Sequence, residues 1–449
     1  MQGLPITADQ APQYTGALPK AADVVVIGGG IIGICTALYA ARDGAKVVVL
    51  EKGLVAAEQS SRNWGWIRQQ GRDPAEMPIM NEAKHLWQAL AAETNHEIGL
   101  TQAGVTYLAF DQERLDGFES WLPNAAANGL DSKLLSKAEI ATAYDGLTDQ
   151  PLGALHTASD FRAEPWVAVP AIAEIATRDG VQIIEHCAVR CLDISGGKVT
   201  GVVTEQGSIR ADRVVLAGGA WSALFLRNHG VSMPQLSVRS QVAATQPLAD
   251  VGQIATSAKR LAFRRRSDGG YTLAPGAGGR PDLYIGPDAF RALPKFINQL
   301  RQDPFGCMLL PFAPKGFPDA WTTARRWSGQ DVSPFEQMRV LDPKPDPKRI
   351  AKLAHDFEAM FPQIGKVTIK ASWAGMIDTM PDIVPVIDAT PIEGLIVGTG
   401  MSGHGFGIGP AVGRILSDMA MGRAAGHDLD RFRFGRFTDG TVMEPGPDV

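Results

Sequence analysis

Residues 24–51 read VVVIGGGIIGICTALYAARDGAKVVVLE, and this stretch decides the fold. An apolar run, Val24 to Ile27, meets the pattern Gly28-x-Gly30-x-x-Gly33, which is followed by a helix-like segment and a second apolar run. Gly28 allows a tight turn, Gly30 lets the backbone approach a pyrophosphate, and Gly33 lets the helix pack closely on the strand. The pattern is typical of a nucleotide-binding turn between a strand and a helix.

The acid that closes the second apolar run strengthens this interpretation. The N-terminus of the predicted helix directs N–H groups and a partial positive charge toward phosphates. Glu51 can accept hydrogen bonds from ribose hydroxyls. Strand, loop, helix, strand and acid in this order predict adenine-dinucleotide binding, and the alternative is an ordinary glycine-rich turn.

Composition indicates a globular protein with more than one domain. The chain has 449 residues, of which 45% are hydrophobic and 20% are charged, and its net charge is −5. This length exceeds one ordinary core, so we expect two domains. The negative charge gives no general field for nucleic acid, so we expect no nucleic-acid partner.

Cysteine usage and hydropathy favour a cytoplasmic location. Cys35, Cys187, Cys191 and Cys307 form no CxxC pair and complete no zinc motif, and the histidine spacing suggests no metal ligands, so we expect neither disulfides nor a metal. The first twenty residues lack a basic segment followed by an apolar one, so no signal peptide is visible. No apolar run reaches the roughly 18 residues that span a bilayer.

The order of predicted elements indicates an α/β protein with a discontinuous first domain. Helical spacing is expected at 77–96, across a polar stretch at 112–145 and at 162–180, and 59–73 is expected to be a long loop. Strands are expected in VQIIEH, VTGVVTE and DRVVLAGGAW, and residues 235–370 favour an inserted antiparallel sheet. We therefore predict a Rossmann-like nucleotide domain at 20–104, 155–234 and 371–430, a substrate domain at 105–154 and 235–370, and terminal extensions at 1–19 and 431–449.

A second glycine-rich loop precedes the last predicted helix. Six glycines lie between Gly398 and Gly409, which implies backbone lying against a flat or anionic ligand. Pro410 suits the first helical position, so we expect that helix to begin there, after Gly409 as its cap.

These motifs, in this order, resemble the D-amino acid oxidase, glycine oxidase and sarcosine oxidase family of FAD-dependent amine oxidoreductases. The resemblance covers about residues 22–425 and rests on VVVIGGGIIG, SSRN, VVLAGGAWS at 214–222, LSVRSQ at 236–241, SDGGYTLAPG at 267–276, WAGMIDTMPDIVPVI at 373–387 and GTGMSGHGFGIGPAVG at 398–413. It implies FAD extended through the nucleotide domain, with its isoalloxazine beside a substrate sheet.

The resemblance also implies a set of FAD-binding residues. They are Gly28, Gly30, Ile31, Ile32, Gly33, Glu51, Lys52, Ser60, Ser61, Arg62, Val189, Gly218, Trp221, Gly375, Gly403, His404, Gly405 and Phe406. Some relatives link FAD through a cysteine in the segment matching Trp373–Pro381, where this chain has Gly375 and Met376, so we expect non-covalent FAD. Relatives carry a lysine after Gly-His-Gly-Phe that binds substrate carboxylate, and this chain has Gly407. Their oxygen-activating lysine is matched by Thr272, which leaves both O2 and another electron acceptor open.

Arginine is the side chain best suited to binding a substrate carboxylate. Arg68 lies in the loop that, by resemblance, passes the flavin, and its alternative is a structural pair with Asp73. Further candidates for contact with substrate are Arg264, Arg266, Arg325, Arg326 and Trp66, with solvent exposure or core packing as the alternative. Tyr271 and His404 join Arg68 as catalytic candidates, although a hydrogen bond to cofactor or backbone suits His404 better than proton transfer.

Together these features predict oxidation of an amino acid or secondary amino acid, or imino acid. By resemblance, hydride passes from the α-carbon to flavin N5, and the resulting imine is hydrolysed by water. The number of arginines near the predicted pocket suggests an imino diacid. Two alternatives stay open: an FAD dehydrogenase of a 2-hydroxy acid, and a non-catalytic FAD-binding assembly subunit.

Overall fold

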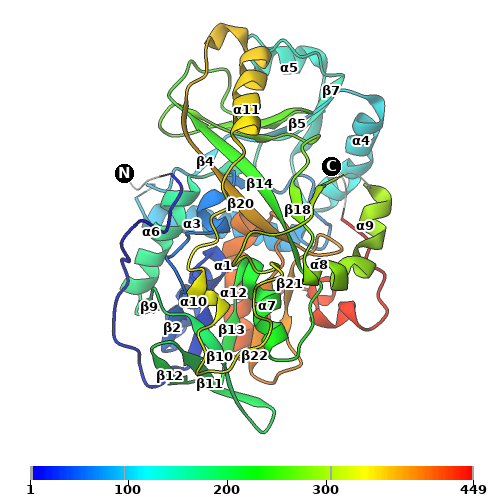
Figure 1. Cartoon of the computed structure of the whole chain (residues 1–449). Helices are drawn as coiled ribbons and strands as arrows, with labels where there is room; N and C mark the ends of the chain where they lie inside the picture. The colour runs from blue at the N-terminus through cyan, green and yellow to red at the C-terminus, as the bar shows by residue number, and fades with distance from the viewer. Residues whose placement is uncertain (1–3, 96, 304–305, 447–449) are drawn as a thin grey trace.

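The computed structural model describes residues 4–95, 97–303 and 306–446. Two large sheets organise these residues, one in each half of the molecule (Figure 1). The first sheet has the strand order β21-β22-β13-β1-β2-β9. Its strands are β1 (Val24–Ile27), β2 (Val47–Leu50), β9 (Gln182–Ile184), β13 (Val214–Leu216), β21 (Val386–Ala389) and β22 (Leu395–Thr399). All its pairings are parallel except β21 with β22, so the carboxyl ends of most strands meet at one edge.

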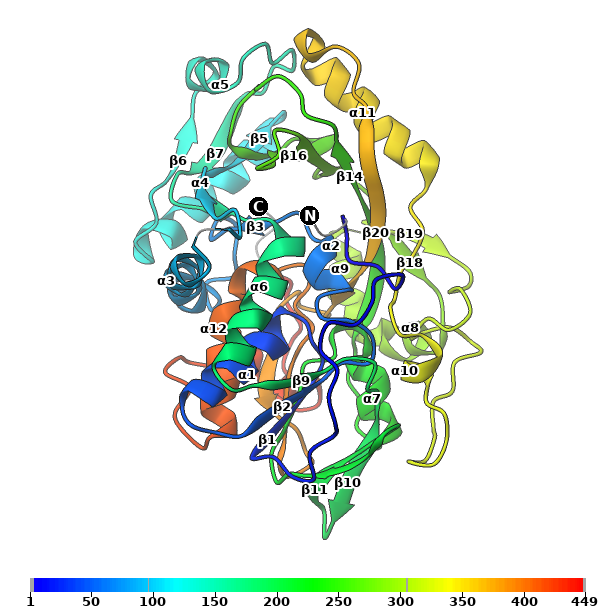
Figure 2. The same cartoon turned by 90° about the vertical axis from the view of Figure 1, so that its left-hand side faces the viewer.

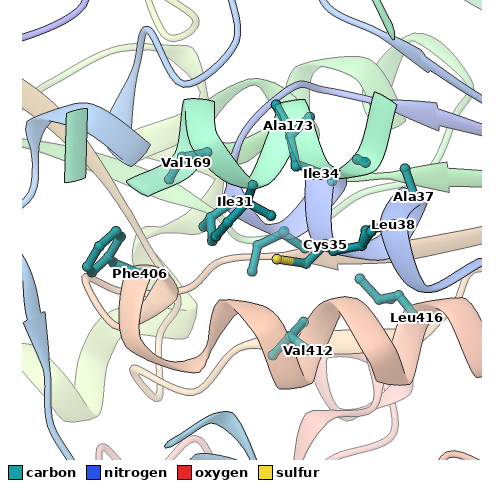
Figure 3. Packing of buried hydrophobic residues seen from close by; sticks show 14 of the residues in the cluster. Ile31, Ile34, Cys35, Ala37, Leu38, Val169, Ala173, Phe406, Val412 and Leu416 are labelled. Atoms are coloured by element: carbon teal, nitrogen blue, oxygen red, sulfur yellow. The ribbon is translucent and has the colours of Figure 1, made fainter. Parts of the chain in front are cut away.

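Three helices cover this sheet because each is apolar enough to be buried on more than one side. Helix α1 (Ile31–Arg42) lies between α6 (Pro165–Arg178) and α12 (Gly405–Ala420), as Figure 3 shows. Glycines permit the close approach: a Cβ on Gly413 would lie 2.4 Å from the Cβ of Cys35. Helix α3 (Met77–Glu93) packs on the outer side of α12, where the Trp87 indole donates to the Gly407 carbonyl.

The second sheet is larger and mainly antiparallel, with the strand order β19-β18-β14-β17-β16-β15-β5-β7-β6 and β20 on β14. The sequence predicted an antiparallel sheet, but two of the pairings, β5–β15 and β18–β19, are parallel. Its strands are β5 (Val105–Ala109), β6 (Ser132–Leu135), β7 (Gly153–Thr157), β14 (Leu236–Thr245), β15 (Ala255–Ser257), β16 (Leu261–Arg265), β17 (Tyr271–Pro275), β18 (Asp282–Tyr284), β19 (Met308–Leu310) and β20 (Ile369–Thr379).

Smaller elements complete the fold. Two three-stranded sheets consist of β10 (Val189–Ser195), β11 (Lys198–Thr204) and β12 (Gly207–Arg210), and of β3 (Trp66–Ile67), β8 (Phe161–Arg162) and β4 (Thr101–Gln102). The remaining helices are α2 (Gln59–Arg62), α4 (Gln112–Ala127), α5 (Lys137–Ala143), α7 (Ser222–Asn228), α8 (Pro287–Ala292), α9 (Ile297–Gln302), α10 (Pro334–Gln337) and α11 (Pro347–Met360). Short 3₁₀ turns cover Gly219–Trp221, Leu293–Phe296, Pro362–Ile364, Asp430–Phe432 and Phe434–Phe437.

Strand β20 crosses from one half of the molecule to the other. It pairs with β14 from Leu236 opposite Thr379 to Thr245 opposite Ile369. The sequence placed a domain boundary at 371, but residues 369–379 belong to the second sheet. Figure 2 shows β20 and β14 running side by side toward the first sheet.

Two other expectations about elements were wrong. The polar stretch 112–145 is not one helix, because α4 ends before Gly129 (φ +70°) and β6 then pairs with β7. The expected loop at 59–73 contains α2 and β3.

The residues beyond the expected domains pack against the first half. The Arg436 guanidinium is buried and donates to Asp382 at 2.8 and 3.2 Å, and Ile6 is buried near the amino end. Among the described residues, no helix is both long and apolar enough to cross a membrane.

Candidate functional site

A cavity of about 400 Å³ lies between the two sheets. One end is lined by the β1–α1 loop and Glu51, and the other by Trp66, Arg68 and Tyr107. The amino end of α12, from Gly403 to Phe406, lines it between these ends. Residues from both sheets and their loops therefore surround one cavity.

The glycines of the first motif have separate geometric roles. Gly28 has φ +111°, and a Cβ there would lie 2.4 Å from the Ala217 carbonyl oxygen. A Cβ on Gly33 would lie 2.0 Å from the carbonyl oxygen of Gly28, so Gly33 packs α1 on the strand and does not line the cavity. Gly30 does line it, and a Cβ there would approach only the Ser60 hydroxyl, at 3.1 Å.

The amino end of α1 is suited to a phosphate. Gly30 caps the helix without a side-chain hydrogen bond, and the Ile31 N–H donates to the Ser60 hydroxyl at 2.9 Å. The first N–H groups of a helix have no partner within it and attract anions. The open space at Gly30 and this helix end together fit the pyrophosphate of a dinucleotide.

Glu51 lies at the end of β2, where its carboxylate fixes the loop. One oxygen accepts from the Gly29 N–H and the other from the Gly53 N–H, both at 2.7 Å. Burial raises the pKa of Glu51, and Lys52 and the two N–H groups act against that rise. Each carboxylate oxygen can accept a further hydrogen bond, so Glu51 fits a ribose at this end of the cavity.

The other residues predicted for the cofactor surround the same space. Those that line the cavity are Gly28, Gly30, Ile31, Ile32, Glu51, Lys52, Ser60, Arg62, Val189, Gly218, Trp221, Gly375, Gly403, His404, Gly405 and Phe406. Ser61 is buried beside them and does not line it. Each of the two cations is paired: Lys52 with Glu58 at 2.5 Å, and Arg62 with Asp342 at 2.5 Å.

Helix α12 begins at Gly405, with His404 as its cap, and not at Pro410 as the sequence suggested. Pro410 lies inside the helix, and the glycines just before it pack against other elements. A Cβ on Gly409 would lie 2.6 Å from Ile31, and one on Gly407 would lie 3.3 Å from Ile67. Only the first part of the glycine-rich loop therefore faces the cavity, and the rest packs against protein.

His404 and Glu76 form a buried pair beside the cavity. His404 Nδ1 lies 3.1 and 3.2 Å from the Glu76 carboxylate oxygens. Burial, followed by the Arg72 guanidinium, lowers the pKa of His404 to about 4. Burial acts to raise the pKa of Glu76, but His404, Arg72 and Arg68 outweigh it and lower that pKa. The ring is therefore neutral at pH 7, with its proton on Nδ1, because an ionised carboxylate can only accept.

Four of the arginines proposed for substrate contact do not line the cavity. Arg264 is completely buried, and its terminal nitrogens donate to the Glu164 carboxylate at 2.9 and 3.1 Å. Arg266 is held by Asp268 and by the Thr245 carbonyl. Arg325 is held by Asp288 and Asp319, and Arg326 is exposed and donates to the Asn228 carbonyl.

Tyr271, expected as a catalytic candidate, also lies away from the cavity. It is completely buried in the core beneath α11, where its ring lies 5.0 Å from that of Phe357, and its hydroxyl accepts from the Val251 N–H at 2.9 Å. Trp66, in contrast, lines the cavity and forms edge contacts with Trp64 at 5.4 Å.

Arg68 and Arg72 both line the cavity. Arg68 is half-buried, lies 5.6 Å from the Tyr107 ring and donates to the Gln70 carbonyl; Asp73, its expected alternative partner, instead pairs with Arg431. Arg72 is 2% exposed, and its Nη1 has no hydrogen-bond partner.

Glu76 lies 3.9 Å from that nitrogen, too far for a hydrogen bond. Burial, followed by the neighbouring Arg68, lowers the pKa of Arg72 to about 9. A buried cation in this position is stabilised by an anion that enters the cavity.

Sequence reasoning did not single out Arg72 or Glu76. The only signal was their spacing, since Arg68, Arg72 and Glu76 follow one another at intervals of four residues. Among the residues that the structure describes, no group of His, Cys, Asp and Glu could hold a metal ion.

Comparisons with known proteins agree with this geometry. The family model described as DAO, FAD dependent oxidoreductase, matches residues 23–419. The sequence is 25% identical over 444 residues to the sarcosine oxidase subunit beta of Arthrobacter sp, covering 95% of this chain and 96% of that protein. The L-amino acid deaminase from Proteus myxofaciens, solved in complex with anthranilate, has a TM-score of 0.90 and 28% identity over 98% of both chains. The L-amino acid deaminase from Proteus vulgaris has a TM-score of 0.89 and 27% identity over 95% of this chain and 100% of that one.

Proposed function

The chain belongs to the DAO family of FAD dependent oxidoreductases, and on that basis we propose that it oxidises an α-amino acid or an N-substituted amino acid whose carboxylate binds to Arg68 and Arg72. The observation that carries this proposal is that Arg72 lines the cavity and that its buried Nη1 has no hydrogen-bond partner. FAD is the cofactor of this family and supplies the hydride acceptor, so that oxidation at the α-carbon leaves an imine that water hydrolyses.

The cations at this end of the cavity suit a single carboxylate. Arg68 and Arg72 both line it, and Glu76 and Asp160 are the carboxylates that act on Arg72. Neither of them hydrogen-bonds to Arg72 Nη1, so one carboxylate group of a substrate would supply the missing partner. The imino diacid suggested by arginine count loses its support, because Arg264, Arg266, Arg325 and Arg326 lie elsewhere, and we propose a monocarboxylate.

The relatives named above support the same class of substrate. By their names, they act on L-amino acids and on sarcosine, an N-methyl amino acid with one carboxylate. A 2-hydroxy acid would also present one carboxylate, and it is the competing substrate class. For the electron acceptor, both O2 and another compound stay open as predictions.

The aromatic residues and α12 complete the proposed site. Trp64, Trp66 and Tyr107 line the end of the cavity that holds Arg68. Their rings would exclude water from the contact between the substrate carboxylate and the two arginines. The positive end of α12 faces the cavity at Gly405 and would stabilise negative charge there.

Two substitutions test the carboxylate contact. Arg68→Gln and Arg72→Gln should each raise KM for an amino acid roughly thirtyfold or more, because a charge-assisted contact is lost from a desolvated site. Neither should change KM much for the corresponding amino acid amide, which lacks the carboxylate. Arg326→Gln is the matched control, since that arginine is exposed and lies outside the cavity. Unchanged KM values in both cavity variants would refute the proposed role of these two arginines.

A further inference from the structure

Large apolar side chains are exposed mainly in one segment of the chain. Among the described residues, the most exposed ones here are Phe312 at 70%, Phe290 and Leu309 at 61% each, and Trp321 at 54%. Leu293 and Ile297, at 42% and 49%, lie in the same segment. Burying such side chains is favourable by roughly 25 cal/mol per Å², so a group of them on a surface indicates an interaction site.

These six residues, which we call the apolar face, lie on neighbouring elements. Phe290 and Trp321 are in ring contact at 6.0 Å, and the Trp321 indole donates to the Ile285 carbonyl at 3.2 Å. The Ile285 N–H in turn donates to the Leu310 carbonyl at 2.8 Å, which brings the end of β19 to the same place. Figure 1 shows α8 and α9 beside β18 on one side of the molecule.

In the helical part of the apolar face, the exposed apolar residues have the spacing of one side of an amphipathic helix. Phe290, Leu293 and Ile297 follow at intervals of three and four residues, so they share one side of the α8–α9 segment. The adjacent side, offset by one residue, carries Ala292 and Phe296 and is buried against Leu236 and Leu283 of the second sheet. The segment thus has one apolar side for its own core and another that faces outward.

Charge around the apolar face has the opposite sign to that of the whole protein. Residues 287–326 contain six Lys or Arg and three Asp, an excess of three positive charges in a chain whose net charge is −5. Arg291, Arg301 and Lys315 are exposed there. A second copy of this chain would bring the same positive charge, whereas an anionic lipid surface complements it.

We propose that the apolar face docks the protein peripherally on an anionic lipid surface. Phe290, Leu293 and Ile297 enter the boundary between headgroups and acyl chains, and Leu309, Phe312 and Trp321 extend the contact. Arg291, Arg301 and Lys315 bind the anionic headgroups around it. This form of docking requires no membrane-spanning helix.

Vesicle flotation of the FAD-loaded protein tests the proposal. The protein should float with phosphatidylcholine vesicles that contain phosphatidylglycerol and much less with phosphatidylcholine alone, and added salt should weaken binding. The triple variant Phe290→Gln, Leu309→Gln, Phe312→Gln should lose binding by about tenfold or more, with unchanged flavin absorbance. The matched control replaces three exposed apolar residues from other parts of the chain and should float like the wild type: Ile194→Gln, Val332→Gln and Val442→Gln.

A charge variant and sedimentation velocity separate lipid binding from other occupants. Arg291→Glu with Arg301→Glu should reduce flotation with anionic vesicles by about tenfold or more. No flotation of the wild type, or equal flotation of the apolar-face variant and the control, would overturn the proposal. A stable wild-type dimer that becomes monomeric in the apolar-face variant would also overturn it, because the face would then bind a second copy.

Discussion

Arg264 and Arg72 are both almost completely buried, yet their surroundings differ. Arg264 donates to the Glu164 carboxylate and to the carbonyl groups of Trp64 and Arg265, so its charge is compensated within the fold. Arg72 keeps Nη1 without a hydrogen bond beside a cavity. Burial of a guanidinium is therefore compatible with either a structural or a binding role, and its partners distinguish the two.

At the same scale, Glu51 should contribute to FAD affinity. Glu51→Ala removes a carboxylate that lines the cavity and holds the Gly29 and Gly53 N–H groups. A hydrogen bond to a charged group contributes about 1.5 to 3 kcal/mol, which corresponds to roughly ten- to a hundredfold weaker FAD binding. Titration of the apoprotein with FAD measures this. Unchanged affinity would mean that Glu51 does not contact the ribose.

The sequence was enough to predict that Arg68 and the first glycine motif lie beside the cavity, but not which groups pair with the other arginines. Gly28, Gly30 and Gly33 act through a local turn, so spacing alone was informative. The partner of Arg264 lies a hundred residues earlier in the chain, at Glu164. Such pairs are fixed by tertiary packing, which periodicity does not reveal.

At the scale of elements, α7 and β10 are joined through His229, which follows the last turn of α7. Its Nε2 accepts from the Leu192 N–H at 3.2 Å, so that nitrogen must be unprotonated. Burial, followed by Arg326, lowers the pKa of His229 from 6.5 to about 4. The unfolded chain therefore binds a proton below pH 6.5 that the folded chain does not bind until about pH 4.

This difference in the pKa of His229 between the folded and unfolded chain predicts that acid lowers the free energy of unfolding. Stability from His229 is present above pH 6.5 and is lost as the pH falls toward 4, by about 2 to 3 kcal/mol at pH 4.5. His229→Gln keeps an acceptor for Leu192 and does not titrate. Urea unfolding at pH 7.5 and pH 4.5, with the same excess of FAD, should show a smaller loss for the variant. An equal loss of stability in both proteins would contradict a neutral, partly buried His229.

Helices and strands with a strong local sequence pattern were predictable. Those whose bounds depend on strand pairing or helix packing were not. The apolar runs at 24–27 and 47–50 and the helix between them follow directly from pattern. The start of α12 was misplaced because its glycines serve helix packing, which looks the same in sequence as a ligand loop. The extent of β20 was missed because it is set by pairing with β14.

At the scale of the whole molecule, two sheets enclose one cavity. The glycine loops before α1 and α12 contact it from the first sheet, and Val242 and Ser257 of the second sheet contact its other end. Motifs from both ends of the chain thus meet around one cavity. The resemblance carried by their order in the sequence was enough to predict that they meet, and the dinucleotide and substrate positions within the cavity stay a proposal.

We propose that the substrate oxidised in this cavity is a monocarboxylic amino acid or N-substituted amino acid. Anaerobic mixing with a panel of D-, L- and N-substituted amino acids, diacids and 2-hydroxy acids tests it most directly, with absorbance of the oxidised flavin as the signal. We expect rapid bleaching by at least one monocarboxylic amine, slower bleaching by its dicarboxylic analogue, and none by the matching 2-hydroxy acid. Bleaching by a 2-hydroxy acid and by no amine, or no bleaching by any compound, would contradict it.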